Sequence, residues 1–268
     1  MKKIVFAAIL AVASSPVLAQ LSTNLGLASD NRFRGISLSQ NSASLQAGVK
    51  YVDKSGFYAG NQNSSVSSQL FTNAAGVEVD LYAGYKKELT KGVAVDVGSM
   101  NYFYPRAGLS AAGKKFDTNE VYAAFTVGPL TAKLNQSLSN YFGLANSVGS
   151  RYWQLDGNLP VAPNLTLQAH VGRTKIAGFN VNDHTDYKIG ASYAMQGWNL
   201  GAHWYTNTAT HAGFEAANTL AGQQLYKNAL VVSAAKPCTG LRSTNLLPSV
   251  SMIFQPPAAV PAAITKAH

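Results

Sequence analysis

One stretch decides the fold that we expect: residues 42–51 have the sequence SASLQAGVKY. Apolar side chains stand at every second position of this stretch, with serine, glutamine, glycine and lysine between them. Successive side chains of a β-strand point to opposite faces, so a period of two predicts a strand with one apolar and one polar face. The same alternation returns in VEVDLYAGYK, residues 77–86.

The alternation recurs from residue 21 to about residue 235 and predicts twelve strands. Most of these segments are close to the roughly 9–11 residues that a tilted strand needs to cross a bilayer. The predicted strands are 21–29, 42–52, 56–65, 75–86, 92–104, 117–127, 130–142, 151–159, 165–174, 185–194, 197–207 and 225–235.

The connections between these strands alternate in length. Short turns, such as 53–55, 128–129 and 195–196, alternate with longer polar loops, such as 105–116 and 208–224. Membrane barrels have short periplasmic turns and longer extracellular loops. If the first strand starts in the periplasm, the first, third and fifth connections are long loops, and this alternation continues to the last strand. A soluble sandwich has no reason to maintain such an alternation.

The polar face of the predicted strands carries many charges, which would be very costly to bury in a sandwich core. Around a wet lumen these charges can pair across the interior, while lipid covers the apolar face and closure leaves no unpaired backbone edge. The sequence therefore predicts an all-β fold, a transmembrane antiparallel up-and-down β-barrel of about twelve strands. A soluble periplasmic β-barrel or sandwich is the alternative.

The candidate pore-lining residues are Asp30, Arg32, Arg34, Lys50, Glu78, Asp80, Lys86, Asp96, Glu120, Lys133, His170, Lys188 and His203.

Composition supports a barrel that meets lipid. Charged residues make up 12% of the chain, about half the usual share. The formal net charge is +9, but five of the basic residues lie in the first three residues or after residue 235. The remaining basic residues are scattered and form no basic run, which argues against a nucleic-acid partner.

The N-terminus has the pattern of a secretory signal, with Lys2 and Lys3 before the apolar residues 4–12 and a small-residue cleavage site at 17–19. We therefore expect residues 1–19 to be a signal peptide, with a retained anchor as the alternative. No run of about 20 apolar residues follows, so no transmembrane helix is predicted.

Three motifs carry a resemblance to a known family: SDNRFRGIS at 29–37, SGFYAG at 55–60 and EVDLYAGY at 78–85. They resemble the TorF porin family, a proteobacterial family of outer-membrane barrels of unknown function. The likeness runs from the leader to about Lys236. It implies an outer-membrane barrel with a transport function and carries over no catalytic residue.

The C-terminal segment departs from that pattern. Such barrels end on a strand with a terminal aromatic residue, which the assembly machinery recognises, whereas here about thirty residues follow the strand that ends near Lys236. The barrel is thus expected to span 20–236. Residues 237–268 are rich in proline and alanine and predict disorder. They are either a frameshift or read-through product or a genuine periplasmic extension.

Arg32 and Arg34 suggest a site in the lumen. Extending the alternation of the first strand places both arginines on the lumen side and Phe33 on the lipid side. Rings of charge inside a pore set ion selectivity, so we expect these arginines to face Glu78 and Asp80 in a charged constriction. A structural ion-pair cluster at the barrel mouth is the alternative.

Aromatic side chains near strand ends suit interfacial girdles. The candidates are Phe33, Tyr51, Phe57, Tyr85, Phe103, Phe142, Tyr193 and Trp198.

No catalytic, metal or cofactor site is predicted. The chain has neither a G-x-S-x-G elbow nor an H-E-x-x-H motif, and the inward His170 and His203 suit hydrogen bonding in the lumen. The loop sequence Asp183-His184-x-Asp186 has potential ligands at a spacing that is not specific for a metal.

The predicted function is an outer-membrane channel for passive or weakly selective passage of small polar solutes or ions. Its expected partners are outer-membrane lipid, the barrel assembly machinery and the solutes, with the oligomeric state left open. Inward tyrosines would narrow the passage, so it is closed or gated by its substrate. The alternative is a non-conducting structural or adhesive barrel that acts through its extracellular loops.

Overall fold

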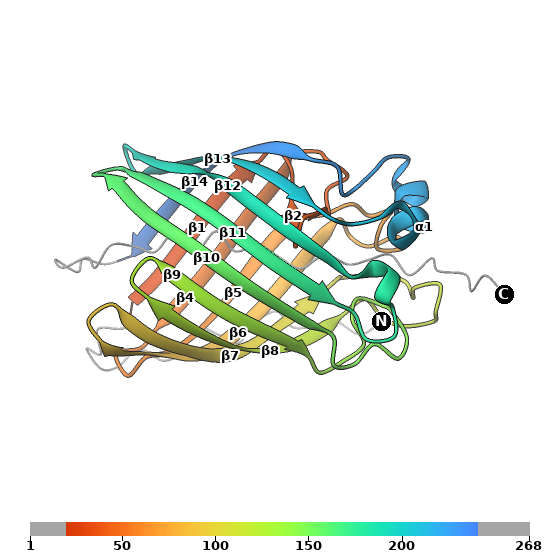
Figure 1. Cartoon of the computed structure of the whole chain (residues 1–268), viewed down its shortest axis with the longest axis horizontal. Helices are drawn as coiled ribbons and strands as arrows, with labels where there is room; N and C mark the ends of the chain where they lie inside the picture. The colour runs from red at the N-terminus through yellow and green to blue at the C-terminus, as the bar shows by residue number, and fades with distance from the viewer. Residues whose placement is uncertain (1–19, 241–268) are drawn as a thin grey trace, which may run out of the picture.

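A closed antiparallel barrel of twelve strands forms the body of the protein (Figure 1). The computed structural model describes residues 20–240. Each strand pairs with its neighbour in the chain, and the first and last strands close the ring. The strands are β1 (Gln20–Ala28), β4 (Ser44–Val52), β5 (Phe57–Ser65), β6 (Val77–Thr90), β7 (Val93–Phe103), β8 (Thr118–Val127), β9 (Leu130–Ser137), β10 (Arg151–Ala162), β11 (Leu165–Lys175), β12 (His184–Met195), β13 (Trp198–Asn207) and β14 (Ala229–Gly240). The predicted fold class and strand number are confirmed.

Two of the predicted strands differ most from the structure, because each ends five residues from its predicted end. The predicted strand 130–142 stops at Ser137, because the chain turns into a loop in which Phe142 has a positive φ of 44°. The predicted strand 225–235 is β14, which runs on to Gly240 and pairs that residue with Leu21. The predicted signal peptide, 1–19, and residues 241–268 of the predicted tail lie outside the described residues.

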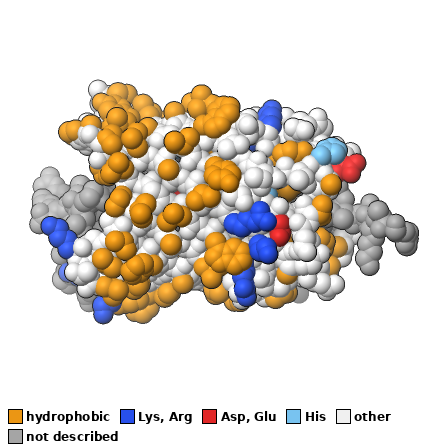
Figure 2. Space-filling view, in the orientation of Figure 1, with side chains coloured by type: hydrophobic (Ala, Val, Ile, Leu, Met, Phe, Trp, Pro, Cys, Tyr) orange, Lys and Arg blue, Asp and Glu red, His pale blue; other side chains and the backbone are white. Residues whose placement is uncertain are grey.

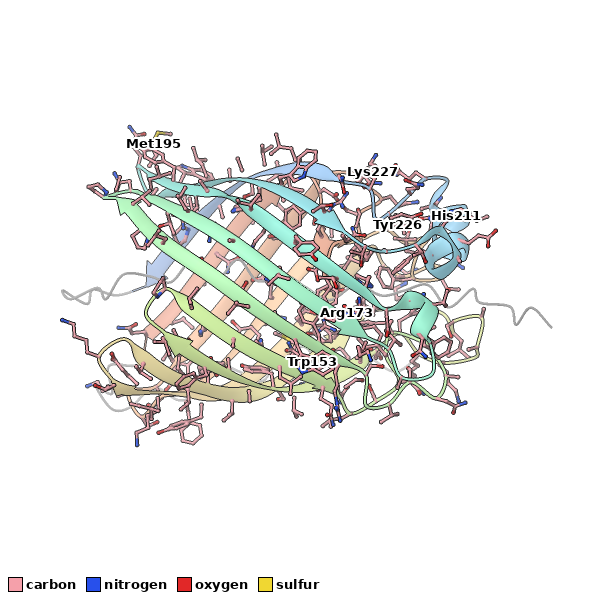
Figure 3. All side chains as sticks on the ribbon, viewed as in Figure 1. Trp153, Arg173, Met195, His211, Tyr226 and Lys227 are labelled. Carbon is pink, nitrogen blue, oxygen red and sulfur yellow. The ribbon has the colours of Figure 1, made fainter. Side chains whose placement is uncertain are left out.

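The predicted alternation of loop lengths is confirmed. Turns of two to four residues join the strands at one end, and loops of 8 to 21 residues join them at the other. Figure 3 places Met195 at the short-turn end and His211 and Tyr226 at the long-loop end. The turn at Gln196 and Gly197 has positive φ at both residues, 50° and 80°, as the hairpin turns that match strand twist require.

Four short elements lie in the long loops: the hairpin strands β2 (Arg32–Phe33) and β3 (Ile36–Ser37), a 3-10 turn at Asn180–Asn182, and the helix α1 (His211–Ala221). Thr210 caps α1 by accepting a hydrogen bond from the Gly213 backbone. Within residues 20–240, no helix has the length and apolar character needed to span a membrane.

Side chains alternate between the lumen and the outer face as predicted. On β6, Glu78, Asp80 and Tyr82 are buried inside the barrel, whereas Leu81 is 45% exposed. Hydrophobic side chains spread over the wall in Figure 2. Trp204 on β13 is one example of an apolar side chain on the outer face and is 47% exposed. This apolar wall suits contact with lipid, because water would not favour so much exposed apolar surface.

A hydrophobic core fills the long-loop end of the barrel. The loops fold inward and bury side chains that the strands do not supply, and the loop members of this core include Phe33, Ile36, Leu38, Leu70, Phe71, Phe116, Phe142, Leu144, Ile176, Phe214 and Leu225. The prediction that Phe33 and Phe142 belong to an interfacial girdle is therefore wrong. Both lie in this loop core because their segments leave the strands and turn into the barrel. Tyr51, Phe57, Tyr193 and Trp198 are at least 42% exposed on the outer face, as a girdle requires.

A lysine on the outer wall tests the lipid contact. Ile189 lies midway along β12 and is 65% exposed. We expect Ile189→Lys to lower the free energy of unfolding in phospholipid vesicles by about 2–4 kcal/mol, the cost of a charge near the bilayer midplane. Urea titration followed by tryptophan fluorescence measures the change. Val181→Lys, in a loop and 48% exposed, is the matched control and should change stability little; equal effects of the two would contradict a lipid-facing wall.

Candidate functional site

The β2–β3 hairpin folds from the first long loop into the lumen. Its turn has positive φ at Arg34 (47°) and Gly35 (82°). A side-chain Cβ at Gly35 would lie 2.8 Å from the Cβ of Asp186 on β12, so only glycine fits this contact with the barrel wall. The Arg34 carbonyl lies 2.9 Å from Nε2 of His184. The hairpin tip is therefore held against the inner wall.

Arg32 stabilises the loop rather than the pore. Its guanidinium donates to Asp30 Oδ2 at 2.7 Å, to Asn41 Oδ1 at 2.9 Å and to the Lys227 carbonyl at 2.6 Å. Asp30 Oδ1 also accepts from Ser37 at 2.6 Å. These buried contacts tie the first loop to the last one.

Arg34 extends from the hairpin to Glu120 on β8 and to Tyr141 in the loop that follows β9. It donates two hydrogen bonds to Glu120, at 3.0 and 2.7 Å, and a third to the Tyr141 hydroxyl at 2.9 Å. Its guanidinium carbon also lies 4.4 Å from the ring centre of Phe33 and 4.2 Å from that of Tyr152. Burial alone would lower the pKa of Arg34, but Glu120 together with Tyr141 and Tyr102 outweighs burial and raises this pKa. Arg34 is thus a charged contact between the hairpin and the wall.

The expected pairing of Arg32 and Arg34 with Glu78 and Asp80 is wrong. Glu78 instead accepts a hydrogen bond from the Tyr104 hydroxyl, and within the described residues neither carboxylate forms a salt bridge. The prediction extended the alternation of β1 past Ala28. The hairpin turns there, so strand phase no longer decides where these side chains point.

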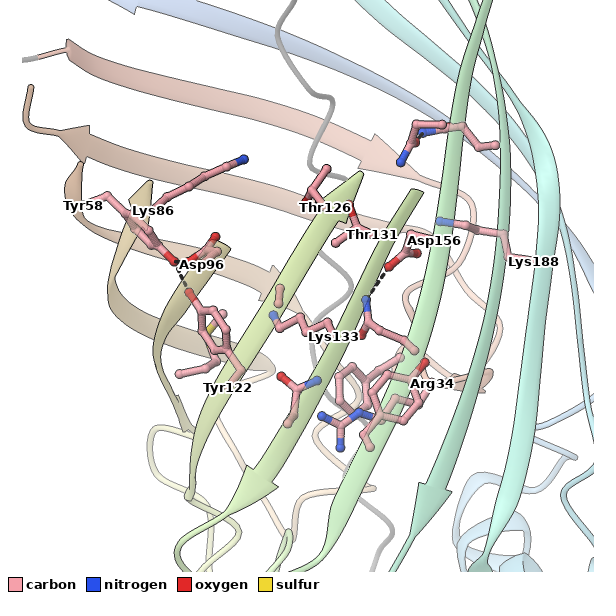
Figure 4. Close-up of a pocket in the computed structure, with 18 of the residues that line it drawn as sticks. Arg34, Tyr58, Lys86, Asp96, Tyr122, Thr126, Thr131, Lys133, Asp156 and Lys188 are labelled. Carbon is pink, nitrogen blue, oxygen red and sulfur yellow. Dashed lines mark hydrogen bonds between the residues drawn. The ribbon is translucent and has the colours of Figure 1, made fainter. Parts of the chain in front are cut away.

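Below the hairpin, the lumen contains a cavity of about 220 Å³ (Figure 4). It extends from Phe33 and Arg34 at the loop core to Thr126 and Thr131, which flank the short turn at 128–129. Six predicted pore-lining residues line this cavity: Arg34, Lys50, Lys86, Asp96, Lys133 and Lys188. The other seven predicted pore-lining residues are buried and do not line the cavity. They are Asp30, Arg32, Glu78, Asp80, Glu120, His170 and His203.

A tyrosine–aspartate cluster forms one side of the cavity. The Tyr58 hydroxyl donates to Asp96 Oδ1 at 2.6 Å and also shares a hydrogen bond with the Tyr122 hydroxyl. Two ammonium groups lie over these rings: Lys50 Nζ is 4.7 Å from the Tyr58 ring centre, and Lys133 Nζ is 3.8 Å from that of Tyr122. Inward glycines make room for the rings, since a Cβ at Gly84 would lie 2.4 Å from the Tyr58 hydroxyl.

A histidine network lies behind another side of the cavity, in contact with the lining residues Tyr152, Asp156 and Gln168. His170 Nδ1 lies 2.7 Å from Asp156 Oδ1, and its Nε2 lies 2.8 Å from the Tyr152 hydroxyl and 3.1 Å from Asp186 Oδ1. With both ring nitrogens engaged, His170 cross-links three strands of the wall. His203 Nε2 lies 2.7 Å from Gln168 Oε1.

Sequence reasoning missed Asp156 as a cavity-lining carboxylate. Its period-two spacing with Gln154 and Asn158, which also line the cavity, would have identified it. Within residues 20–240, no group of three or more histidine, cysteine or acidic side chains is arranged to hold a metal ion.

A family model described as "Bacterial protein of unknown function (Gcw_chp)" matches residues 10–237. The chain belongs to this family. The Gcw_chp match agrees with the expected bacterial family of unknown function, and the finer assignment to the TorF family stays a prediction. No curated protein sequence matches the chain.

Solved structures similar to this Gcw_chp protein include several barrels. One, described as "Unveiling the Mechanism Behind the in-meso Crystallization of Membrane Proteins", has 13% identity and a TM-score of 0.50, covering 84% of this chain and 86% of that chain. The KdgM porin has 6% identity and a TM-score of 0.49, covering 81% and 97%. The COG4313 outer membrane channel from Pseudomonas putida F1 has 14% identity and a TM-score of 0.44, covering 85% and 97%.

Breaking the Arg34–Glu120 pair tests the contact between hairpin and wall. We expect Glu120→Gln to cost about 3–5 kcal/mol of unfolding free energy, because a buried guanidinium loses its partner. The double variant Arg34→Met/Glu120→Leu should cost less, because it removes both charges. Urea titration of the refolded protein measures both. Glu215→Gln, exposed on α1, is the control, and a Glu120→Gln effect no larger than this control would contradict the assignment.

Proposed function

We propose that this protein is an outer-membrane channel for small polar solutes, and that its loop core is the closed gate. One observation carries the proposal: a cavity lined by charged and polar side chains lies inside a closed barrel whose outer wall is apolar. An apolar wall suits lipid, and a polar lumen suits hydrated solutes. The resemblance to the TorF porin family supports the same function.

The loop lengths suggest the orientation of the barrel. Short turns face the periplasm and long loops face the outside in barrels of this kind. In this orientation the loop core closes the outer end, and the cavity lies on the periplasmic side of it. The signal peptide expected at 1–19 would direct export, and the barrel assembly machinery would insert the chain into the outer membrane.

The hairpin is the element best placed to act as the gate. It occupies the lumen above the cavity, and Arg34 connects it to Glu120 on β8. It also contacts the wall through His184 on β12, and other loops through Arg32 and the loop core. An inward movement of solute would require this hairpin to leave the wall, so opening depends on the Arg34 contacts.

A non-conducting barrel that acts through its loops is the second candidate. The packing of the loop end favours it, since Leu38, Phe71 and Phe142 have no exposed surface and form a well-filled core. A binding or adhesive surface would benefit from loops held in one arrangement. Conductance separates the two functions.

Removing the hairpin should open the channel. Ala28 and Ser44 are paired across β1 and β4, so a short Gly-Ser connector in place of residues 31–40 can rejoin the two strands. In planar bilayers we expect the wild-type barrel to open rarely and the shortened variant to show larger discrete current steps, because the lumen above the cavity is cleared.

Replacement of the exposed Ala111 and Ala112 by glycine is the control and should leave the current as in wild type. Heat-modifiable gel migration establishes that each barrel is folded. Persistent silence of the folded, shortened variant would exclude the channel and favour the non-conducting barrel.

A further inference from the structure

Four lysine side chains line the cavity without a carboxylate partner or a hydrogen-bond acceptor in the described wall. Lys50, Lys86, Lys133 and Lys188 form no salt bridge and donate no side-chain hydrogen bond within the part of the chain that the structure describes. Lys50 and Lys133 lie over aromatic rings, with their ammonium groups 4.7 Å from the Tyr58 ring centre and 3.8 Å from the Tyr122 ring centre. Each ammonium group therefore keeps its three donors for water or for a solute.

The two carboxylates of the cavity are already occupied by other donors. Asp96 accepts from the Tyr58 hydroxyl at 2.6 Å. Asp156 uses one oxygen for His170, at 2.7 Å, and the other for Gln154, at 2.6 Å. The acids thus bind neighbours in the wall rather than the lysines, and four ammonium groups face the cavity against two carboxylates. Walls with an excess of one sign of charge concentrate the opposite sign in the space between them.

The lysines come from different sides of the barrel. They lie on β4, β6, β9 and β12, and Figure 4 shows Lys86 and Lys188 on opposite walls with Lys133 between them. The strand pairing explains part of this arrangement. Direct partners run from Lys86 through Asp96 and Ala124 to Lys133, which forms one row across four strands. A solute in the cavity would be reached by cations from several directions.

The remaining lining groups suit a hydroxylated molecule. Thr126, Thr131, Asn158 and Gln168 supply uncharged donors and acceptors around the same space. The volume of about 220 Å³ is below the roughly 300–1,000 Å³ of pockets for drug-sized ligands. The cavity therefore has room for a small solute only.

We infer that this cavity is a binding site for small hydroxylated organic anions, held by Lys50, Lys86, Lys133 and Lys188. The carboxylate or other oxyanion contacts the ammonium groups, and the hydroxyls contact the threonine and amide side chains. This inference rests on the proposed function, because it names the class of solute that the channel selects. Rings of lysine or arginine favour anions in other pores.

Binding of two probes of similar size and different charge tests the inference. Gluconate carries one carboxylate, and sorbitol is its uncharged counterpart. Isothermal titration of the full chain, refolded in detergent, should show gluconate binding at least about tenfold tighter than sorbitol binding. Raising the salt from about 0.1 M to 1 M shortens the Debye length from about 10 Å to 3 Å and should weaken gluconate binding.

A charge-matched pair of variants locates the site. Replacement of the four cavity lysines (K50Q, K86Q, K133Q, K188Q) should lower gluconate affinity at least about tenfold. The control replaces four exposed lysines outside the cavity (K54Q, K91Q, K114Q, K115Q), removes the same charge and should bind gluconate as wild type does. The wild-type comparison of gluconate with sorbitol needs neither variant, so it tests the inference even where the cavity variant does not fold.

Equal binding of gluconate and sorbitol, no binding of either, or unchanged affinity of the folded cavity variant would overturn the inference. The result is independent of conductance. A wild-type barrel that binds gluconate while the opened variant stays silent supports the anion site and contradicts the channel. If the opened variant conducts but the wild-type barrel does not bind gluconate, the channel is supported and the anion site is contradicted.

Discussion

Closure of the barrel between β1 and β14 is the constraint on which the rest of the structure depends. Leu21 to Ala28 pair on one side with β14 and on the other with β4, so the first strand has no free edge. In apolar surroundings each unpaired backbone group would cost several kcal/mol, since no water is present to replace the missing hydrogen bond. Closure also separates the two faces of every strand, because one face must then point outward and the other into a confined interior.

That confined interior explains why polar side chains are paired so closely. Two contacts of 2.7 Å are examples. Arg34 and Glu120 join a loop to a strand, and His170 and Asp156 join two strands. Such pairs compensate charges that the lumen partly removes from water. The cavity lysines differ from these groups, because the carboxylates near them are engaged by Tyr58, Gln154 and His170. The uncompensated charge therefore lies at the cavity surface and not in the wall.

The two ends of the barrel differ because the connections differ in length. Two-residue turns, such as the one at Gln196 and Gly197, only reverse the chain. Loops of up to 21 residues have enough chain to fold inward, and they carry apolar side chains such as Ile36 and Leu70 that avoid water by packing together. A barrel with a closed loop end and a polar cavity below it is the result.

The sequence by itself determined the strands, their number and the face to which each side chain points, because period-two alternation is a local property of an extended backbone. It therefore predicted that Lys86 and Lys133 point inward, and both line the cavity of the structure. Only the tertiary structure decided the places of Phe33, Arg34 and Phe142. They lie in loops, where no periodicity relates neighbours, and their positions depend on contacts with residues far away in the chain, such as Glu120 for Arg34. A distant partner also decided where β14 ends. Residues up to Gly240 form a strand because they pair with β1.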